Sequence, residues 1–204
     1  MSLSGGLSPL QKDRLAIRRY LRGHGLMECL TYSLVNAKEK DELAYLHIGE
    51  CYLLKNPMTD DHCYLRKNTL ASLVDAATYN LAHQAEDFAL FEVSDVDAPS
   101  YQSNHLSVVL IGKENIQGSL ARRPYDFYSL KGLAEGIFTL LGLNLNRIRM
   151  VKLVSKNNEF HPGRSAALYL GKDLLAVLGE FHPSFKKEHD LPEEALGMEM
   201  DLSL

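Results

Sequence analysis

The stretch from Glu159 to Gly171, EFHPGRSAALYLG, combines the residue types that most readily handle a phosphate group. It sets His161, Gly163, Arg164 and Ser165 around a proline. Successive backbone N–H groups at a flexible glycine can form an anion-binding nest, to which the arginine would add charge. The alternative is a structural corner, because Pro-Gly is a standard type II turn pair and arginine often satisfies carbonyls or carboxylates. The residues alone favour the corner.

Other patterns that carry chemistry are missing from the sequence. No two histidines stand four residues apart beside a glutamate, and no cysteine–histidine group has finger spacing. His62 and Cys63 are adjacent, so on a strand they would point to opposite faces. There is no G-x-S-x-G elbow and no glycine-rich phosphate loop. The sequence therefore predicts no metal site, no cofactor site and no catalytic residue.

A basic and aromatic run, ARRPYDFYSLKG from Ala121 to Gly132, could bind single-stranded RNA by stacking and phosphate contacts. The alternative is structural: Pro124 interrupts the chain, and Phe127 and Tyr128 then lead a helix into the core. The net charge of −4 disfavours a general nucleic-acid binder. We therefore expect the structural role.

Length and composition are those of one globular domain. The chain has 204 residues, of which 46% are apolar and 24% charged. No apolar run approaches the roughly 20 residues that a membrane-spanning helix needs. Residues 1–6, MSLSGG, resemble an expression scar and are expected to be disordered. Three cysteines without C-x-x-C spacing indicate a reducing compartment, which suggests the cytoplasm.

The hydrophobic periodicity predicts helices and strands in an α+β order. An N-cap serine, a proline and a final glycine frame a helix over 9–25, and apolar stripes predict helices over 69–84 and 129–141. A short helix is expected within 36–46. Strands are expected at 26–35, 51–56, 88–96, 106–112, 150–154, 166–170, 174–181 and 196–204. Together these elements predict an antiparallel β-sheet flanked by helices.

Several segments, in order, resemble the β subunit of bacterial phenylalanyl-tRNA synthetase, in its internal module with a class II synthetase-like core. They are LSPLQKDRLAIRRYLRGHGLMECLTYSLV, LKNPMTDDHCYLRKNTLASLVDAATYNLAHQ, FALFEV, DFYSLKG, FHPGRSAALYLG and LGEFHPSF. The resemblance implies that residues 7–204 form one class II-like domain, a fragment of a longer β chain. A tryptophan common before DFYSLKG is missing here, and NTLASL stands where the family often has Ser-Leu-Leu-Pro-Gly.

The resemblance also implies partners. Two α and two β subunits associate in this family, with helices of both building the contact, so the first helix becomes a candidate subunit interface. Its candidate contact residues are Leu10, Arg14, Ile17, Arg18 and Leu21. ATP, magnesium and tRNA are expected for the whole enzyme, through parts of it outside this fragment. Without its partner, such a patch could cause the isolated fragment to associate with itself.

The resemblance further implies that this module does not activate an amino acid. Class II adenylate formation needs arginines near the ATP phosphates. The catalytic α subunit supplies them from two segments, which here read EVSDVDAP and GMEMDLSL and contain no arginine. We expect a non-catalytic scaffold that holds the α subunits. Two alternatives stay open: a free-standing class II-like paralogue with its own small ligand or nucleotide, and a plain RNA-binding module.

Overall fold

The computed structural model describes residues 5–47, 49–99, 101–114, 122–155 and 157–203. Of the six residues expected to be disordered, 1–4 lie outside these ranges. Gly5 and Gly6 are exposed and have no regular secondary structure.

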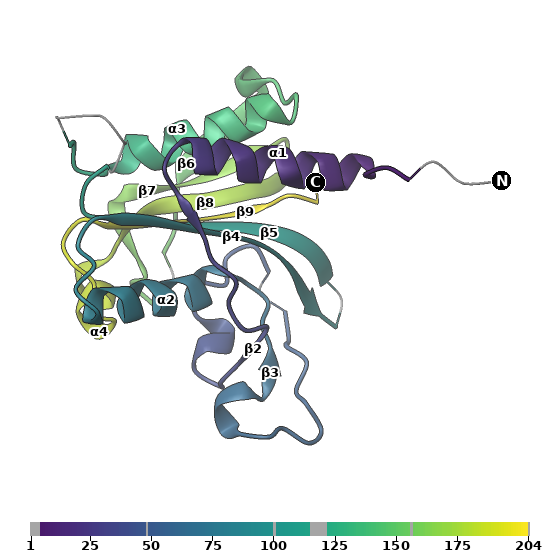
Figure 1. Ribbon diagram of the computed structural model, residues 1–204, viewed down its shortest axis with the longest axis vertical. Coiled ribbons are helices and arrows are strands. Elements are labelled where there is room, and N and C mark those ends of the chain that lie inside the picture. Colours follow the sequence, from purple (N-terminus) through teal and green to yellow (C-terminus); the bar gives the residue numbers. More distant parts are fainter. Residues whose placement is uncertain (1–4, 48, 100, 115–121, 156, 204) are drawn as a thin grey trace.

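A mixed sheet of seven strands forms the centre of the molecule (Figure 1). Its spatial order is β1 (Met27–Glu28), β4 (Phe88–Ala98), β5 (Tyr101–Ile111), β9 (Ala195–Asp201), β8 (Asp173–Phe181), β7 (Phe160–Leu170) and β6 (Ile148–Lys152). Every neighbouring pair is antiparallel except β1 with β4, which is parallel. The predicted antiparallel sheet flanked by helices is confirmed, with one parallel edge strand added.

Helices cover both faces of this sheet and create two cores. Helices α1 (Pro9–Gly23) and α3 (Phe127–Leu140) lie on one face, and α2 (Leu70–Ala82) and α4 (Pro183–Glu188) lie on the other (Figure 1). Along β5, Val108 and Leu110 point into the first core while Val109 and Ile111 point into the second. A central strand buried on both faces reads as a continuous apolar run, which is why SVVLI shows no alternation.

Local sequence signals explain where the long helices begin and how closely they pack. Ser8 accepts the backbone N–H of Gln11, and the Gln11 side chain accepts the backbone N–H of Ser8, which makes a capping box for α1. In α3, Gly136 faces Tyr20 of α1, where a Cβ atom would lie 1.9 Å from the phenol oxygen. The glycine therefore lets the two helices approach.

Residues 30–69 form a lobe that projects from the α2 side of the sheet (Figure 1). The lobe contains the small sheet of β2 (Leu34–Val35) and β3 (Tyr64–Leu65) and two 3₁₀ turns, η1 (Glu39–Asp41) and η2 (Asp60–His62). The strand predicted over 26–35 is wrong, because the chain leaves the main sheet after Glu28. The helix expected in 36–46 is only η1, and 51–56 contributes a single bridge at Leu53. Contacts with the large sheet, rather than a local pattern, hold this lobe.

Two further differences concern the ends of strands. Strands β4 and β5 form one long hairpin, instead of stopping at a polar loop around Pro99, because their polar residues pair across it from Glu92 to Ala98. The last strand, β9, begins where expected and ends at Asp201. Helix α4 and the 3₁₀ turn η3 (Leu145–Arg147) were not predicted.

Candidate functional site

The two segments that lack the arginines expected of a catalytic core lie on β4 and β9, on either side of β5 in the sheet. Glu92 of β4 pairs in register with Ser107 of β5, which pairs in turn with Glu199 of β9. The next such row is Ser94, His105 and Asp201. Side chains in both rows face α2 and the lobe. The sheet order, which the sequence does not reveal, places the carboxylates of both segments on one face.

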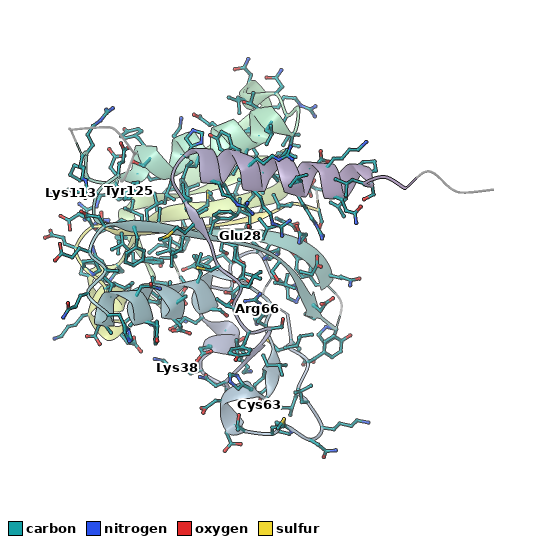
Figure 2. All side chains as sticks on the ribbon, viewed as in Figure 1. Glu28, Lys38, Cys63, Arg66, Lys113 and Tyr125 are labelled. Atoms are coloured by element: carbon teal, nitrogen blue, oxygen red, sulfur yellow. The ribbon has the colours of Figure 1, made fainter. Side chains whose placement is uncertain are left out.

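Glu92 is buried, and one of its oxygens forms an ion pair while the other accepts a hydrogen bond from a hydroxyl. Its side chain is 1% exposed, and the Arg66 guanidinium, 2% exposed, donates from Nη2 to Oε1 over 2.6 Å. The Thr31 hydroxyl donates to the other oxygen, also over 2.6 Å. Arg66 and Thr31 come from the lobe, as Figure 2 shows for Arg66 at the junction of lobe and sheet. This arginine therefore neutralises a residue of its own chain.

Glu199 is fully buried, and partners from within the chain contact only one of its two oxygens; Oε2 has no hydrogen-bond partner among the described residues. The Thr69 backbone N–H donates to Oε1 over 2.8 Å, and the same oxygen lies 2.9 Å from Nδ1 of His105. Nε2 of His105 lies 2.8 Å from the Tyr101 hydroxyl, which donates to Asp201 over 2.8 Å. Burial, together with the Asp201 carboxylate, raises the pKa of Tyr101, so the phenol keeps its proton.

Residues of the lobe cover this polar network on the side that faces away from the sheet. The His47 ring stacks on Tyr101 with centroids 4.4 Å apart, and Asn68 donates from its amide to the Glu42 carbonyl. Lys67, almost fully buried, reaches Asp41 over 2.5 Å. Side chains of the chain itself therefore fill the space between the lobe and this face of the sheet.

The Phe160–Ser165 segment is a bulge within β7, so the predicted type II turn is wrong. Five residue steps from Phe160 to Ser165 face two steps in β8, from Phe181 to Gly179. Gly163 does not have the positive φ that a type II turn needs. The extra residues are accommodated because Gly179 has no side chain: a Cβ there would lie 2.6 Å from the Arg164 carbonyl oxygen.

The side chains of this bulge are already engaged, which argues against an open anion nest. The Gly163 N–H donates to Nδ1 of His161 over 3.1 Å, and the Ser165 hydroxyl donates to the His161 carbonyl over 2.8 Å. Arg164 pairs through Nε with Glu180 over 2.5 Å. The structural interpretation of these four residues fits the geometry, although the element is a bulge and not a corner.

The repeated Phe-His-Pro motif has a simple geometric origin. Phe160 and Phe181 are cross-strand partners in β7 and β8, and their rings stack 5.4 Å apart. His182 then accepts the Ser184 N–H at Nδ1, as His161 accepts that of Gly163. The pairing of β7 with β8 therefore brings the two Phe-His-Pro segments side by side.

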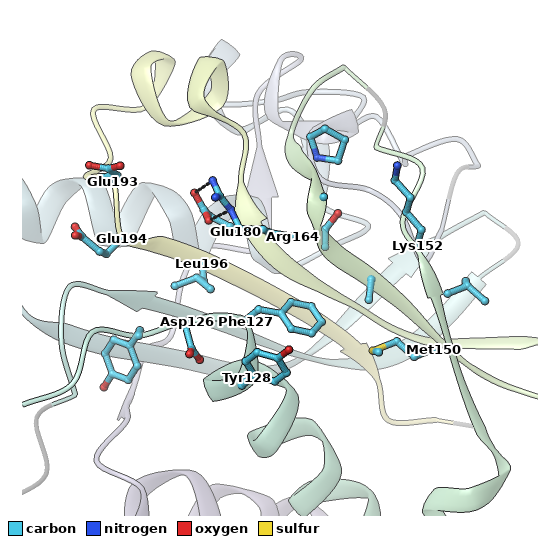
Figure 3. Close-up of a pocket in the computed structure, with 16 residues that line it drawn as sticks. Asp126, Phe127, Tyr128, Met150, Lys152, Arg164, Glu180, Glu193, Glu194 and Leu196 are labelled. Carbon is cyan, nitrogen blue, oxygen red and sulfur yellow. Dashed lines mark hydrogen bonds and ion pairs between the residues drawn. The ribbon is translucent and has the colours of Figure 1, made fainter.

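An open cleft of about 790 Å³ lies on the opposite face of the sheet, at the beginning of α3. We call it the α3 cleft. Residues of α3, β6, β7, β8 and β9 line it, among them Phe127, Tyr128, Met150 and Lys152, together with Glu193 and Glu194 just before β9 (Figure 3). Arg164 and its partner Glu180 form part of its wall. Two stretches that the sequence singled out meet here: Gly163, Arg164 and Ser165 of the candidate anion nest, and residues 125–128 of the basic and aromatic run, all line the cleft. The sequence did not indicate that these stretches would lie side by side, because they are far apart along the chain.

The candidate interface residues on α1 divide into two groups. Ile17 and Leu21 are 1% and 0% exposed and belong to the core, so they cannot present a surface to a partner, and their prediction as contact residues is wrong. Their spacing marked the inner face of the helix, which the sheet covers. Leu10 is exposed, and 47% of it is open to solvent.

The two candidate arginines of α1 tether the helix to the sheet. Arg14 pairs with Asp95 over 2.8 Å, and Arg18 pairs with Glu28 over 2.5 Å and donates to the Val93 carbonyl. Burial acts to raise the pKa of Glu28, but hydrogen bonds and charge from Arg22 and Arg18 outweigh it, so the pKa is lowered. Both arginines are thus part of the helix–sheet contact.

The parts of the chain that the structure describes contain neither a metal-binding cluster nor a membrane-spanning helix. No group of three or more histidine, cysteine or acidic side chains there could hold an ion, and Cys29, Cys51 and Cys63 are free thiols. Within the same ranges, no helix has the length and apolar character needed to cross a bilayer.

Solved structures with a similar fold include aminoacyl-tRNA synthetases. Two structures of pyrrolysyl-tRNA synthetase from Desulfitobacterium hafniense superpose with a TM-score of 0.69 and cover 95% of this chain. They are 14% and 13% identical in sequence, and this chain covers 66% and 67% of theirs. At such low identity the likeness establishes the fold, and it confirms the expected class II-like core.

Sequence relatives are considerably more similar. The phenylalanine–tRNA ligase beta subunits of Geobacillus kaustophilus and Bacillus subtilis are 35% and 34% identical, over 93% and 98% of this chain. That of Listeria monocytogenes is 35% identical over 94%. The chain spans about a quarter of the length of these relatives. A family model, the phenylalanyl tRNA synthetase beta chain CLM domain, matches residues 1–202. The chain therefore belongs to the phenylalanyl-tRNA synthetase beta chain CLM domain family.

Proposed function

We propose that this chain is a non-catalytic module of a phenylalanine–tRNA ligase β subunit, which supports assembly with the catalytic α subunit in the cytoplasm. In the complete enzyme, two α and two β subunits would charge tRNA with phenylalanine, using ATP and magnesium bound outside this chain. The observation that carries the proposal is the filled sheet face. Where a class II core would hold a nucleotide, Glu92 and Glu199 are buried among partners from the lobe.

Electrostatics supports the absence of adenylate chemistry. A bound ATP would need to displace the lobe and would then meet the carboxylates of Glu92, Glu199 and Asp201. Arg66 lies close enough to help, but removing it from Glu92 would leave a buried carboxylate without its partner, which typically costs several kcal/mol. The binding of a nucleotide would have to exceed that cost.

Assembly is supported by apolar surface around α1 and β1. Leu7 and Leu10, at the start of α1, are 49% and 47% exposed, and Met27 and Leu30, beside the short edge strand, are 54% and 84% exposed. β1 pairs on one side only, with β4. An edge strand with exposed apolar side chains favours pairing with another chain.

Titration calorimetry with ATP and with phenylalanine tests the non-catalytic role. We expect no heat of binding for either ligand with the isolated chain, because the network fills the site. Micromolar affinity for both would contradict the proposal and would support the alternative, a free-standing paralogue with its own ligand. The α3 cleft, whose volume falls within the range of small-molecule sites, is the feature that favours this alternative.

A further inference from the structure

The α3 cleft is a strip of the sheet that the helices leave uncovered. On this face α1 and α3 pack on the sheet, but the part that they cover ends at the first turn of α3. Beyond it, Leu196 and Ala166, both buried, form the floor of the cleft, and Glu180 lies in its wall. Tyr128 is 73% exposed and Met150 is 50% exposed at its margin. Sheets of this kind normally bury their apolar face against another layer, so an open strip with large apolar side chains suits a further piece of polypeptide.

Charge is distributed unevenly along the cleft. Figure 3 shows Glu193 and Glu194 at one end and Lys152 at the other, with the rings of Phe127 and Tyr128 between them. Both glutamates are exposed, and in the described ranges no basic side chain forms an ion pair with either of them. Arg164, by contrast, is neutralised by Glu180. The cleft is therefore complementary to a segment with positive charge at one end.

The same polypeptide is the source that best fits this requirement. Curated relatives are about four times longer than the part that this chain matches, so each supplies several hundred further residues on the same chain. A tethered segment also has a high effective concentration at the cleft, which favours it over a separate molecule.

We propose that the α3 cleft binds a segment of the same polypeptide from outside these 204 residues. A large apolar side chain of that segment would pack on Tyr128 and Met150, and a lysine or arginine of it would pair with Glu193 and Glu194. The inference rests on the proposed function in one respect, that this chain is a module of a longer β subunit. It does not depend on the α subunit.

Hydroxyl-radical footprinting of Tyr128 and Met150 tests this docking. The oxidation rates of both side chains are compared between the 204-residue chain and the longer β chain that contains it, without α subunit. We expect at least about fivefold slower oxidation in the longer chain, because the core of an interface excludes water. Met58, which is 99% exposed on the lobe, serves as the internal reference.

Charge reversal then identifies the acidic end. In the longer chain, E193K/E194K should restore the fast oxidation of Met150, while D60K/D61K, an equal change of charge on the exposed η2 turn, should leave it slow. Circular dichroism of E193K/E194K in the short chain confirms that it folds, since both side chains are exposed. Fast oxidation of Met150 in E193K/E194K, but not in D60K/D61K, supports the assignment of the basic side chain to Glu193 and Glu194.

Each contrary result points elsewhere. Equal oxidation in the short and long chains, or protection that survives E193K/E194K, overturns the proposal. Protection that appears only after the α subunit is added also overturns it and assigns the cleft to that partner. Protection of the short chain that grows with its concentration would assign the cleft to a second copy. Co-purification with the α subunit is scored separately, so a failure of the proposed function is recognised as such.

Discussion

The ion pair between Arg66 and Glu92 illustrates, at the scale of single residues, how a buried charge is kept. Both side chains are nearly inaccessible, and neither could be recognised as a pair from the sequence, since 26 residues separate them. The available signal was Glu92 itself, a charged residue inside the apolar run FALFEV. A charge in such a run must find a partner, but the partner is set by the position of the lobe.

Breaking this pair should destabilise the fold strongly. Arg66→Met or Glu92→Gln should each lower the free energy of unfolding by about 3–5 kcal/mol, because the remaining polar group stays buried without its partner. Urea denaturation measures the change. Arg22→Met is the matched control: Arg22 pairs with Glu28 over 2.6 Å but is 59% exposed, so its loss should cost no more than about 1 kcal/mol. Similar, small losses in all three variants would show that the network is accessible to water.

His189 should make stability depend on pH. Its Nε2 lies 3.0 Å from Glu42. Burial and the charge of Lys38 act to lower the pKa of His189. The hydrogen bond to Glu42 and the negative charges of Glu42 and Asp75 act in the opposite direction and outweigh them, so the pKa is raised. The folded state therefore holds this proton more tightly than the unfolded state. The resulting stability is complete below about pH 6.5 and is lost as the pH rises through the higher folded pKa.

Thermal melts between pH 5.5 and 8.5, a range of about three units around the histidine value, measure this contribution. The wild type should exceed His189→Gln in melting temperature at the acidic end, and the difference should shrink as the pH rises. His83→Gln, on an exposed histidine after α2, should show no such trend. A wild-type advantage that grows with pH would contradict the assignment.

At the scale of elements, the three long helices were predictable, and the lobe was not. Caps and apolar stripes located α1, α2 and α3 within a few residues, because those signals are local. The segment over 26–35 reads as one strand, yet β1 and β2 belong to different sheets. The bulge in β7 depends on Gly179 in β8, so EFHPGRS alone could only suggest a turn. Contacts between distant segments decide both cases.

Alanine substitutions at two glycines in α3 distinguish the effect of helix propensity on stability from the effect of packing. Gly132 has open space where a side chain would begin, so Gly132→Ala should stabilise the protein by up to about 1 kcal/mol. Gly136→Ala adds the same helix propensity but places its methyl group against Tyr20, which should reverse the sign and cost about 1–3 kcal/mol. Chemical denaturation compares the two variants. In a Tyr20→Leu background the cost at position 136 should fall; stabilisation by both alanines in the native background would contradict the close packing.

At the scale of the whole molecule, the family determines what the surfaces should bind. The class II-like core could be predicted from ordered segments, whereas two of the candidate contact residues, Ile17 and Leu21, are buried, because periodicity marks the buried side of a helix as readily as an interface. Around α1 and β1, the exposed apolar side chains include Leu7, Leu10, Met27 and Leu30.

Co-expression with a cognate α subunit tests this surface. We expect the two chains to elute together, and L10D/L30D to abolish co-elution while its circular dichroism stays unchanged, since both leucines are exposed. Met58→Asp, on the far end of the lobe, is the control and should still co-elute. Without α subunit, the unmodified chain should run larger than a monomer in gel filtration, and L10D/L30D should not. Co-elution that survives L10D/L30D would place the contact on another surface.

The strand order has a consequence for biosynthesis. β9, the last strand along the chain, lies between β5 and β8, so it alone joins the first half of the sheet to the second. A ribosome that has made everything up to Glu194 has produced two half-sheets, each with an apolar strand edge open to pairing. Folding of the sheet must then wait for residues 195–201, which complete its centre rather than its edge. Nascent chains of this module should therefore depend on chaperones until translation has passed β9.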